Sequence, residues 1–135
     1  MKEDKDVRWK QRFQNYKKAL SQLEAALKVK KPDILQKQGT IQWFEYTFEL
    51  AWKTLQDFLM QERGYVEARG PRPVLEQAFQ DGIIKDGLIW MDMLKSRNLT
   101  THLYDEKSVE KIYTNVVQEY YTLFQALGKF FEDQV

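Results

Sequence analysis

The sequence predicts an all-α protein, an up-and-down antiparallel helical bundle of three long helices and one or two short ones. Apolar residues recur at spacings of three and four along most of the chain, which is the period of an amphipathic helix. No segment alternates apolar and polar residues over the length of a strand, and the Asn-Gly signal of a hairpin is absent. With 135 residues, 43% of them hydrophobic, the chain is expected to form one domain over residues 1–135 with its core at about 8–133.

The first helix is predicted over residues 6–29. The residues of its apolar stripe are Trp9, Phe13, Tyr16, Leu20, Leu23 and Leu27. Pro32 should end this helix, because a proline disfavours helical backbone at the residue before it, here Lys31.

The second helix is predicted to run from Asp33, which can form a capping box with Gln36, to about Glu62. The residues of its stripe are Ile41, Phe44, Phe48, Trp52, Leu55 and Leu59. The Gly-Thr pair at 39–40 is a candidate break near the start. Gly64 suits the left-handed backbone position that follows a helix end.

The remaining helices are shorter until the end of the chain. Residues 64–73 are dense in glycine, proline and arginine and are expected to form a loop. Pro73 suits the first turn of a short helix that closes at Asp81-Gly82, and a second short helix is expected to start near Asp86. A long helix should then occupy residues 105–133.

The composition excludes several kinds of site. The chain has no cysteine and one histidine, so neither a disulfide nor a transition-metal site is expected. Its six glycines form no Gly-x-Gly fingerprint, which gives no support for nucleotide binding through a Gly-rich turn, and no cofactor is expected. No window approaches about 18 uninterrupted apolar residues, which together with the lack of cysteine favours a cytoplasmic protein outside the membrane.

Positive charge is concentrated at the start of the chain. Residues 1–31 hold ten Lys or Arg against four Asp or Glu, although the net charge of the whole chain is only +1. Arg63, Arg69 and Arg72 form a second basic cluster in and beside the predicted loop. These residues are candidates for contact with RNA or with an acidic partner protein, and a solvated helix face is the alternative interpretation.

Aromatic residues make up 14% of the chain, more than the interior of one small bundle comfortably holds. Near neighbours such as Phe44 and Tyr46 point in different directions on a helix, so some aromatic side chains should lie outside the core. A homodimer that buries the excess is one hypothesis, because large contiguous apolar patches are uncommon on monomers.

Two glutamates on the second predicted helix are candidates for binding magnesium. Glu45 and Glu49 lie four residues apart and therefore share a helix face. Lys53 follows Glu49 by four residues, in the favourable orientation for a helical salt bridge. This arrangement favours a structural role for the glutamates, and no metal site is predicted.

The candidate site for chemistry lies between the second short helix and the last helix. The only histidine, His102, follows Arg97 by five residues, and on one regular helix the two side chains would point about 140° apart. They can face one pocket if the short helix ends near Asn98 and the chain then turns. A histidine with a pKa of about 6.5 can accept a proton at neutral pH, and a guanidinium suits a phosphate, so the pair suggests phosphodiester chemistry. A purely structural histidine fits the same spacing.

Three sequence blocks occur in order: WFEYTFELAWKTL at residues 43–55, PVLEQAFQDGII at 73–84 and RNLTTHLY at 97–104. Together they resemble the nucleotidyltransferase substrate-binding protein family of the HEPN superfamily, over roughly residues 8–133. The resemblance implies a HEPN-like bundle that dimerises and that binds a minimal nucleotidyltransferase encoded nearby, in many cases as a toxin–antitoxin pair.

The resemblance also implies roles for four residues. The family motif, an arginine followed by a polar residue and then by a histidine, matches Arg97, Asn98 and His102 and is associated with metal-independent RNA cleavage. Tyr104 matches a tyrosine that partner nucleotidyltransferases modify with AMP in related pairs. The alternative is a non-catalytic subunit that presents a nucleotide or another substrate to the partner, in which case Arg97 and His102 are not needed for RNA breakage.

Overall fold

The computed structural model describes residues 8–99 and 105–135, and all regular structure in these ranges is helical. The elements are α1 (Arg8–Leu27), α2 (Ile34–Arg63), α3 (Pro71–Gln80), α4 (Gly87–Leu99), α5 (Glu106–Asn115), the π-helical turn η3 (Val116–Tyr120) and α6 (Tyr121–Gln134). The predicted all-α bundle is confirmed.

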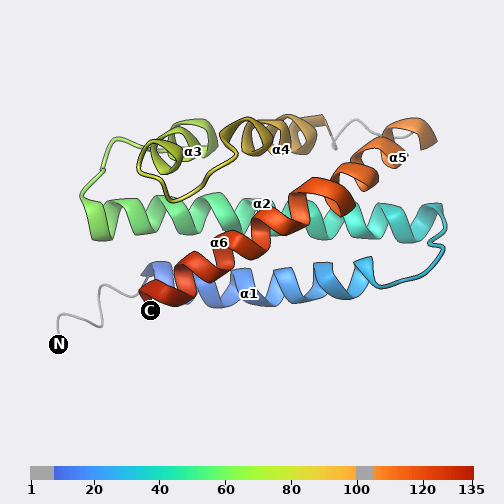
Figure 1. Cartoon of the computed structure of the whole chain (residues 1–135), viewed down its shortest axis with the longest axis horizontal. Helices are drawn as coiled ribbons and strands as arrows, with labels where there is room; N and C mark the ends of the chain where they lie inside the picture. Colours follow the sequence, from blue (N-terminus) through green and yellow to red (C-terminus); the bar gives the residue numbers. More distant parts are fainter. Residues whose placement is uncertain (1–7, 100–104) are drawn as a thin grey trace.

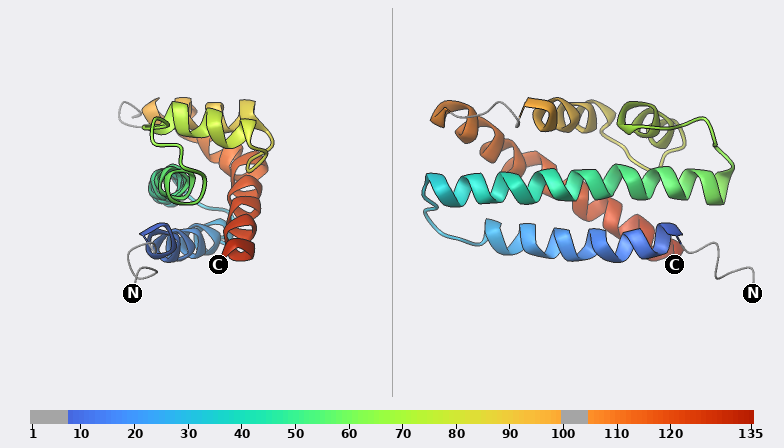
Figure 2. Two further views of the ribbon diagram at one scale, coloured as in Figure 1. Left: turned by 90° about the vertical axis from the view of Figure 1, so that its left-hand side faces the viewer. Right: turned by 180° about the vertical axis from the view of Figure 1, so that it is seen from behind.

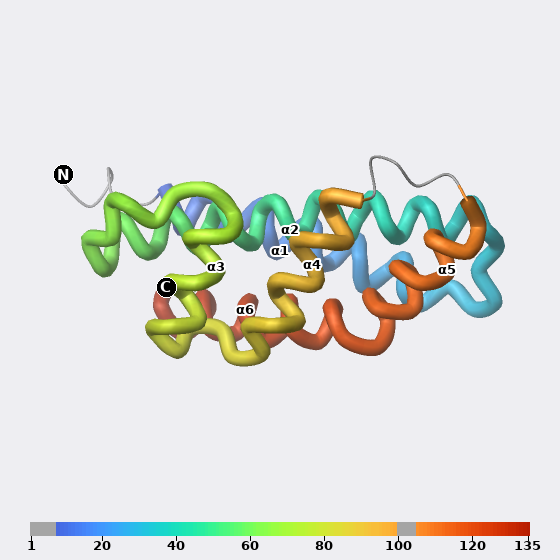
Figure 3. Tube along the Cα trace, turned by 90° about the horizontal axis from the view of Figure 1, so that it is seen from above, coloured from blue at the N-terminus to red at the C-terminus, as the bar shows by residue number. Residues whose placement is uncertain are grey.

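The long helix α2 forms the centre of the bundle and contacts α1, α3, α4, α5 and α6. α1 runs antiparallel to α2 on one side, and α3 and α4 cover the opposite side (Figure 1). The segment from α5 to α6 crosses the bundle diagonally (Figure 2). Seen from above, α3 and α4 run obliquely between α2 and the crossing helix (Figure 3). The end of α4 is therefore placed over α2.

The ends of α2 follow from local sequence signals. Asp33 Oδ1 accepts a hydrogen bond from the Gln36 backbone N–H (2.8 Å), and Gln36 Oε1 accepts one from the Asp33 N–H (2.9 Å), which confirms the predicted capping box. Gly64 ends the helix with φ 75°, in the left-handed region that favours glycine. The predicted break at 39–40 is wrong, because Thr40 Oγ1 bonds back to the Gln36 carbonyl (2.9 Å) within an unbroken helix.

α3 begins inside the segment 64–73 that was expected to be a loop. Its first helical residue is Pro71, and Gly70 before it has φ 87°. Pro73 lies in the first turn, as predicted. Both prolines fit in the first turn because their missing N–H groups would have no intrahelical acceptor there. The predicted close of this helix at Asp81-Gly82 is confirmed.

The last helical segment is not the single regular helix that the pattern predicted. The π turn η3 inserts one extra residue between α5 and α6 and so rotates the residues that follow. Tyr120, in this turn, is fully buried, and its hydroxyl lies 2.5 Å from Asp92 Oδ2 and 2.9 Å from Ser96 Oγ. Both partners lie on α4, so the turn fastens α4 to the crossing helix.

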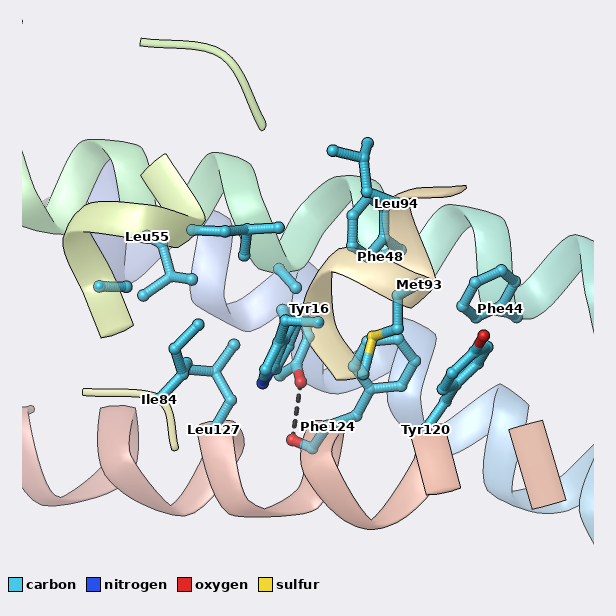
Figure 4. Close-up of a cluster of buried hydrophobic side chains, with 14 of the residues drawn as sticks. Tyr16, Phe44, Phe48, Leu55, Ile84, Met93, Leu94, Tyr120, Phe124 and Leu127 are labelled. Atoms are coloured by element: carbon cyan, nitrogen blue, oxygen red, sulfur yellow. Dashed lines mark hydrogen bonds between the residues drawn. The ribbon is translucent and has the colours of Figure 1, made fainter. Parts of the chain in front are cut away.

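Buried aromatic side chains fill the centre of the bundle (Figure 4). Phe44 of α2 stacks on Tyr120 with ring centroids 5.2 Å apart, and its centroid lies 6.1 Å from that of Phe124. Tyr16 of α1 donates a hydrogen bond of 2.7 Å to the Phe124 carbonyl (Figure 4). The three long helical segments therefore meet at one cluster.

Candidate functional site

Arg97 and Asn98, two of the residues proposed for catalysis, lie at the C-terminal end of α4. Arg97 Nη1 donates a hydrogen bond to Asn98 Oδ1 (3.0 Å). The other terminal nitrogen of Arg97, Nη2, pairs with the carboxylate of Glu49 on α2. The structure therefore brings Arg97 and Asn98 together and adds an acidic residue to them. His102 and Tyr104 lie outside the described residues.

The register of α4 turns Arg97 toward α2. Trp90, Met93 and Leu94 are buried on the inner face of this helix. Arg97 follows Met93 by four residues and Trp90 by seven, so it continues the same face. Its side chain is 33% exposed, which places the guanidinium at the rim of the helix–helix contact. The described part of α4 runs to Leu99, so Arg97 and Asn98 both lie in its last turn.

Glu49 is the site residue that the sequence did not reveal. The predicted salt bridge with Lys53 is present at 3.9 Å, and this local pair is a sufficient explanation for a glutamate at this position. The contact with Arg97 joins residues 48 positions apart in the chain, which no helical period can predict. Two signals were available: Glu49 lies in the sequence block at residues 43–55, and it follows Phe48 at the edge of the buried stripe of α2.

The position of α4 depends on a second polar contact, the one made by Tyr120. Burial, followed by the hydrogen bond to Asp92, raises the pKa of Tyr120 far above its usual range. The phenol therefore stays protonated at neutral pH and donates to the Asp92 carboxylate, while Ser96 Oγ donates to the phenol oxygen. Because Asp92 and Ser96 precede Arg97 on α4, this network fixes the helix that carries the site.

An open groove of about 440 Å³ lies between α4 and the start of α3. Arg72, Lys95 and Asn98 line it, together with the Asp92 carboxylate and the apolar side chains Leu88, Met91, Leu94 and Leu99. Asn98 thus connects the Arg97 contact to this groove. Two cations against one carboxylate give the groove a net positive lining, as contact with a phosphate would require.

The three arginines of the predicted basic cluster have different surroundings. Arg63 pairs with Asp81 (2.8 Å), and only Arg72 lines the groove beside Asn98. Arg69 is close enough to the buried carboxylate of Asp57 to lower its pKa. The three arginines therefore do not form one basic patch around a common ligand, and Arg72 is the one beside the candidate site.

Asp57 is a buried carboxylate on α2 with a basic shell. It is 3% exposed, and its Oδ2 lies 3.1 Å from Arg12 Nη1 of α1. Burial raises the pKa of Asp57, and the charges of Arg12, Arg8 and Arg69 oppose this rise without cancelling it. Part of the positive charge of the first helix is therefore used to compensate an internal carboxylate.

The raised pKa of Asp57 predicts a pH-dependent effect of Asp57→Asn. Because the pKa of Asp57 in the native state lies above the usual aspartate value of about 3.9, the native state stays protonated to a higher pH than the unfolded state does. Over that pH range the contribution of Asp57 to stability falls as pH rises. The free energy of unfolding of the Asn variant should therefore improve relative to wild type between pH 4 and pH 7. Urea unfolding at both pH values measures this difference.

Asp133→Asn removes one negative charge at an exposed position and controls for the change in net charge. If the Asp57→Asn variant loses stability relative to wild type as the pH rises from 4 to 7, the sign of the argument is wrong.

Metal binding and membrane insertion find no support in the described parts of the chain. Within residues 8–99 and 105–135, no three Asp, Glu, His or Cys side chains gather as a metal-ion site would require. No helix in these ranges combines the length and the apolar character needed to cross a bilayer.

The sequence of this chain matches one family model and one named protein. The sequence model of a family described as "Nucleotidyltransferase substrate binding protein like" matches residues 11–133. A protein of Haemophilus influenzae, named "Probable ribonuclease HepT", is 31% identical over 81 residues. This match covers 58% of the present chain and 56% of the relative, so it spans only about half the length of each.

Two solved structures share the fold. A crystal structure of a protein from Thermus thermophilus superposes with a TM-score of 0.77 at 32% identity, covering 85% of this chain and 98% of that one. A Haemophilus influenzae structure, described as revealing the fold of a substrate binding domain of a nucleotidyltransferase, has a TM-score of 0.77 at 24% identity. It covers 89% of this chain and 98% of its own, and at this identity the likeness supports the fold alone.

Proposed function

This chain belongs to the nucleotidyltransferase substrate-binding protein family, and we propose that it is the HEPN component of a two-protein module with a minimal nucleotidyltransferase. In this proposal the pair is a toxin–antitoxin module, and the present chain cleaves RNA without a metal ion. The observation that carries the proposal is the contact of Arg97 with Asn98 at the end of α4, at the start of the Arg-to-His motif. The relative named a probable ribonuclease supports it.

The proposed reaction is attack of a ribose 2′-oxygen on the adjacent phosphorus. The O2′–P bond forms and the P–O5′ bond breaks, which leaves a 2′,3′-cyclic phosphate and a free 5′-hydroxyl. His102 accepts the proton of the 2′-hydroxyl or donates one to the leaving oxygen, and Arg97 stabilises the charge that develops on the phosphate. Asn98, held by Arg97, orients the guanidinium or the phosphate. Because the chain has one histidine, the second proton-transfer group is water or comes from another subunit.

The test of this function is cleavage of end-labelled RNA by purified protein in EDTA. Fragments that carry 2′,3′-cyclic phosphate are the expected product, because the attacking group is the neighbouring ribose hydroxyl. Absence of cleavage by the unmodified protein, checked by its intact mass, would reject the ribonuclease function.

The second candidate is a non-catalytic subunit that binds a nucleotide or another substrate for the partner enzyme. The groove lined by Arg72, Lys95 and Asn98 favours it, because these side chains can hold a phosphate without breaking it. The description of the matching family as substrate binding protein like points the same way. Nucleotide binding by a protein that never cleaves RNA would support this candidate over the first.

A homodimer completes the proposed site. Large apolar side chains are exposed on α3 and α4: Phe79 is 54% exposed, Leu88 is 88% exposed, and Leu99, two residues after Arg97, is 48% exposed. Such a surface is uncommon on a monomer, and a second subunit on it would supply the missing proton-transfer group. Light scattering at micromolar concentration should give the mass of a dimer, and a monomeric mass would contradict this arrangement.

Control by the partner is proposed to act at Tyr104. Transfer of AMP from ATP forms a bond between the phenol oxygen and phosphorus and releases pyrophosphate. The bulky, charged product two residues after His102 would block RNA. Intact mass after incubation with the partner and ATP tests this step, with Tyr104→Phe as the variant that cannot be modified.

RNA is proposed to extend from the site along the groove, so Arg72→Ala should weaken RNA binding without changing the chemical step. Removal of one interaction with a phosphate should lower the slope of log affinity against log salt by about 0.7 for a single strand. The measurement is fluorescence anisotropy with a labelled RNA whose 2′-hydroxyl at the cleavage position is replaced by hydrogen.

Arg63→Ala is the matched control for Arg72→Ala, because its guanidinium already pairs with Asp81. We expect it to change the salt slope less. Equal slopes for wild type and Arg72→Ala would remove the groove from the RNA path.

A further inference from the structure

Arg97 forms an ion pair with an acidic residue of the central helix α2. The Glu49 carboxylate of α2 pairs with Arg97 Nη2, and the two residues belong to helices that no loop directly joins. The exposed fractions of the two side chains are 25% and 33%, so the contact lies at the rim of the bundle where a ligand can reach it. It is an interaction between elements, whereas the Arg97–Asn98 bond is local.

The two contacts together restrict the orientation of the guanidinium. Nη2 is held by Glu49, and Nη1 donates to Asn98 Oδ1 at 3.0 Å. A planar guanidinium held at both terminal nitrogens has little freedom to rotate about its long, flexible side chain. An arginine that stabilises charge in a transition state acts best when it is already in place, since reorganisation during the reaction is then avoided.

The helix that carries Glu49 is a rigid support. Phe48 before it is fully buried, and Ala51 after it is fully buried as well. Lys53 faces the same carboxylate from its own helix at 3.9 Å and balances its charge. On the opposite side, Tyr120 fastens α4 through Asp92 and Ser96. Both ends of the Glu49–Arg97 contact are therefore anchored in the core.

We propose that Glu49 is a positioning residue that holds Arg97 in the orientation needed for its action on a phosphate. The proposal rests on the proposed RNA cleavage for its effect on rate, but the ordering of Arg97 is a property of the protein alone. A merely structural ion pair at this degree of exposure would contribute little to stability and nothing to catalysis.

The kinetic test is Glu49→Ala, measured by RNA cleavage at varied substrate concentration. We expect kcat to fall by about 10- to 100-fold with little change in KM, the size of effect that a misplaced catalytic group produces. Glu49→Gln should recover part of the loss, because a carboxamide oxygen at this position can accept a hydrogen bond from the guanidinium. In an Arg97→Ala background, Glu49→Ala should cause no further loss, because the two residues act as one unit.

Glu110→Ala is the matched control. It removes another ion pair between α2 and a neighbouring helix, the one with Lys37 at 2.5 Å. Lys37 precedes Glu49 by twelve residues on α2, which is about 18 Å along the helix. Equal losses of kcat in the Glu110 and Glu49 variants would show that any such ion pair has the same effect, and would overturn the proposal.

A second readout is independent of RNA cleavage. The heteronuclear NOE of the Arg97 Nε–Hε group should be high in the wild type, as for an ordered side chain, and should fall in Glu49→Ala but not in Glu110→Ala. If the wild type cleaves no RNA and this pattern holds, the ribonuclease function fails while the positioning role stands. An Arg97 signal that is equally ordered without Glu49 overturns the positioning role whatever the activity.

Discussion

His102→Ala is expected to lower the rate of RNA cleavage by about 10²- to 10⁴-fold, the range that loss of a general acid or base produces. The chain has no second histidine to replace it. Proton transfer at the 2′-hydroxyl or at the leaving oxygen would then fall to water, while the electrostatic contribution of Arg97 would remain. The measurement is single-turnover cleavage of end-labelled RNA in EDTA, with the cyclic phosphate ends identified.

Two controls accompany this variant: one excludes a contaminating ribonuclease, and the other shows that the variant is folded. It is prepared in parallel with the wild type by the same procedure, so that a contaminating ribonuclease would cleave in both samples. Circular dichroism and thermal unfolding should match those of the wild type. Unchanged cleavage with the same cyclic ends in the His102→Ala sample would discard the mechanism and favour the substrate-binding subunit.

The boundaries of α2 were predictable because local chemistry sets them. The capping box of Asp33 with Gln36 and the left-handed Gly64 both act within one turn of the helix ends, so the sequence contains the information. The predicted loop at 64–73 extends too far because Pro71 and Pro73 are both acceptable in the first turn of a helix. The positive φ of Gly70, just before Pro71, marks the observed start of α3.

The π turn η3 was not predictable from the apolar period. It coincides with a contact between distant parts of the chain, the hydrogen bonds of Tyr120 with Asp92 and Ser96 on α4. A regular helix has the same apolar pattern over Val116–Tyr120, and no cap or breaker in the sequence marks the extra residue. Tertiary contacts of this kind override local preference and leave no local signal.

The candidate site shows the same division. Arg97 and Asn98 are neighbours in the chain, so a motif can identify both. Glu49 reaches them only because α4 crosses α2, and the local pair with Lys53 already accounts for it in the sequence. Residues that hold a catalytic group from another helix are therefore the part of a site that sequence patterns miss.

Phe44→Ala is expected to cost about 3–5 kcal/mol of unfolding free energy, as for other buried aromatic truncations. Phe44 is fully buried and contacts Tyr120 and Phe124 of the crossing helix and Phe48 of its own helix. This loss is a large part of the free energy of unfolding of a small domain, which is about 5–15 kcal/mol. For a chain of this size it corresponds to a fall in Tm of roughly 10–20 °C. Thermal and urea unfolding measure both quantities.

Tyr46→Ala is the matched control, because it removes an aromatic ring from the same helix at a position that is 51% exposed. Its effect should be much smaller, since the ring leaves no closed cavity and contacts mainly Trp43. Phe44 also supports Tyr120 and, through Asp92 and Ser96, the helix that carries Arg97. Cleavage by Phe44→Ala well below its Tm should therefore fall, and equal stability losses in the two variants would contradict the role given to this cluster.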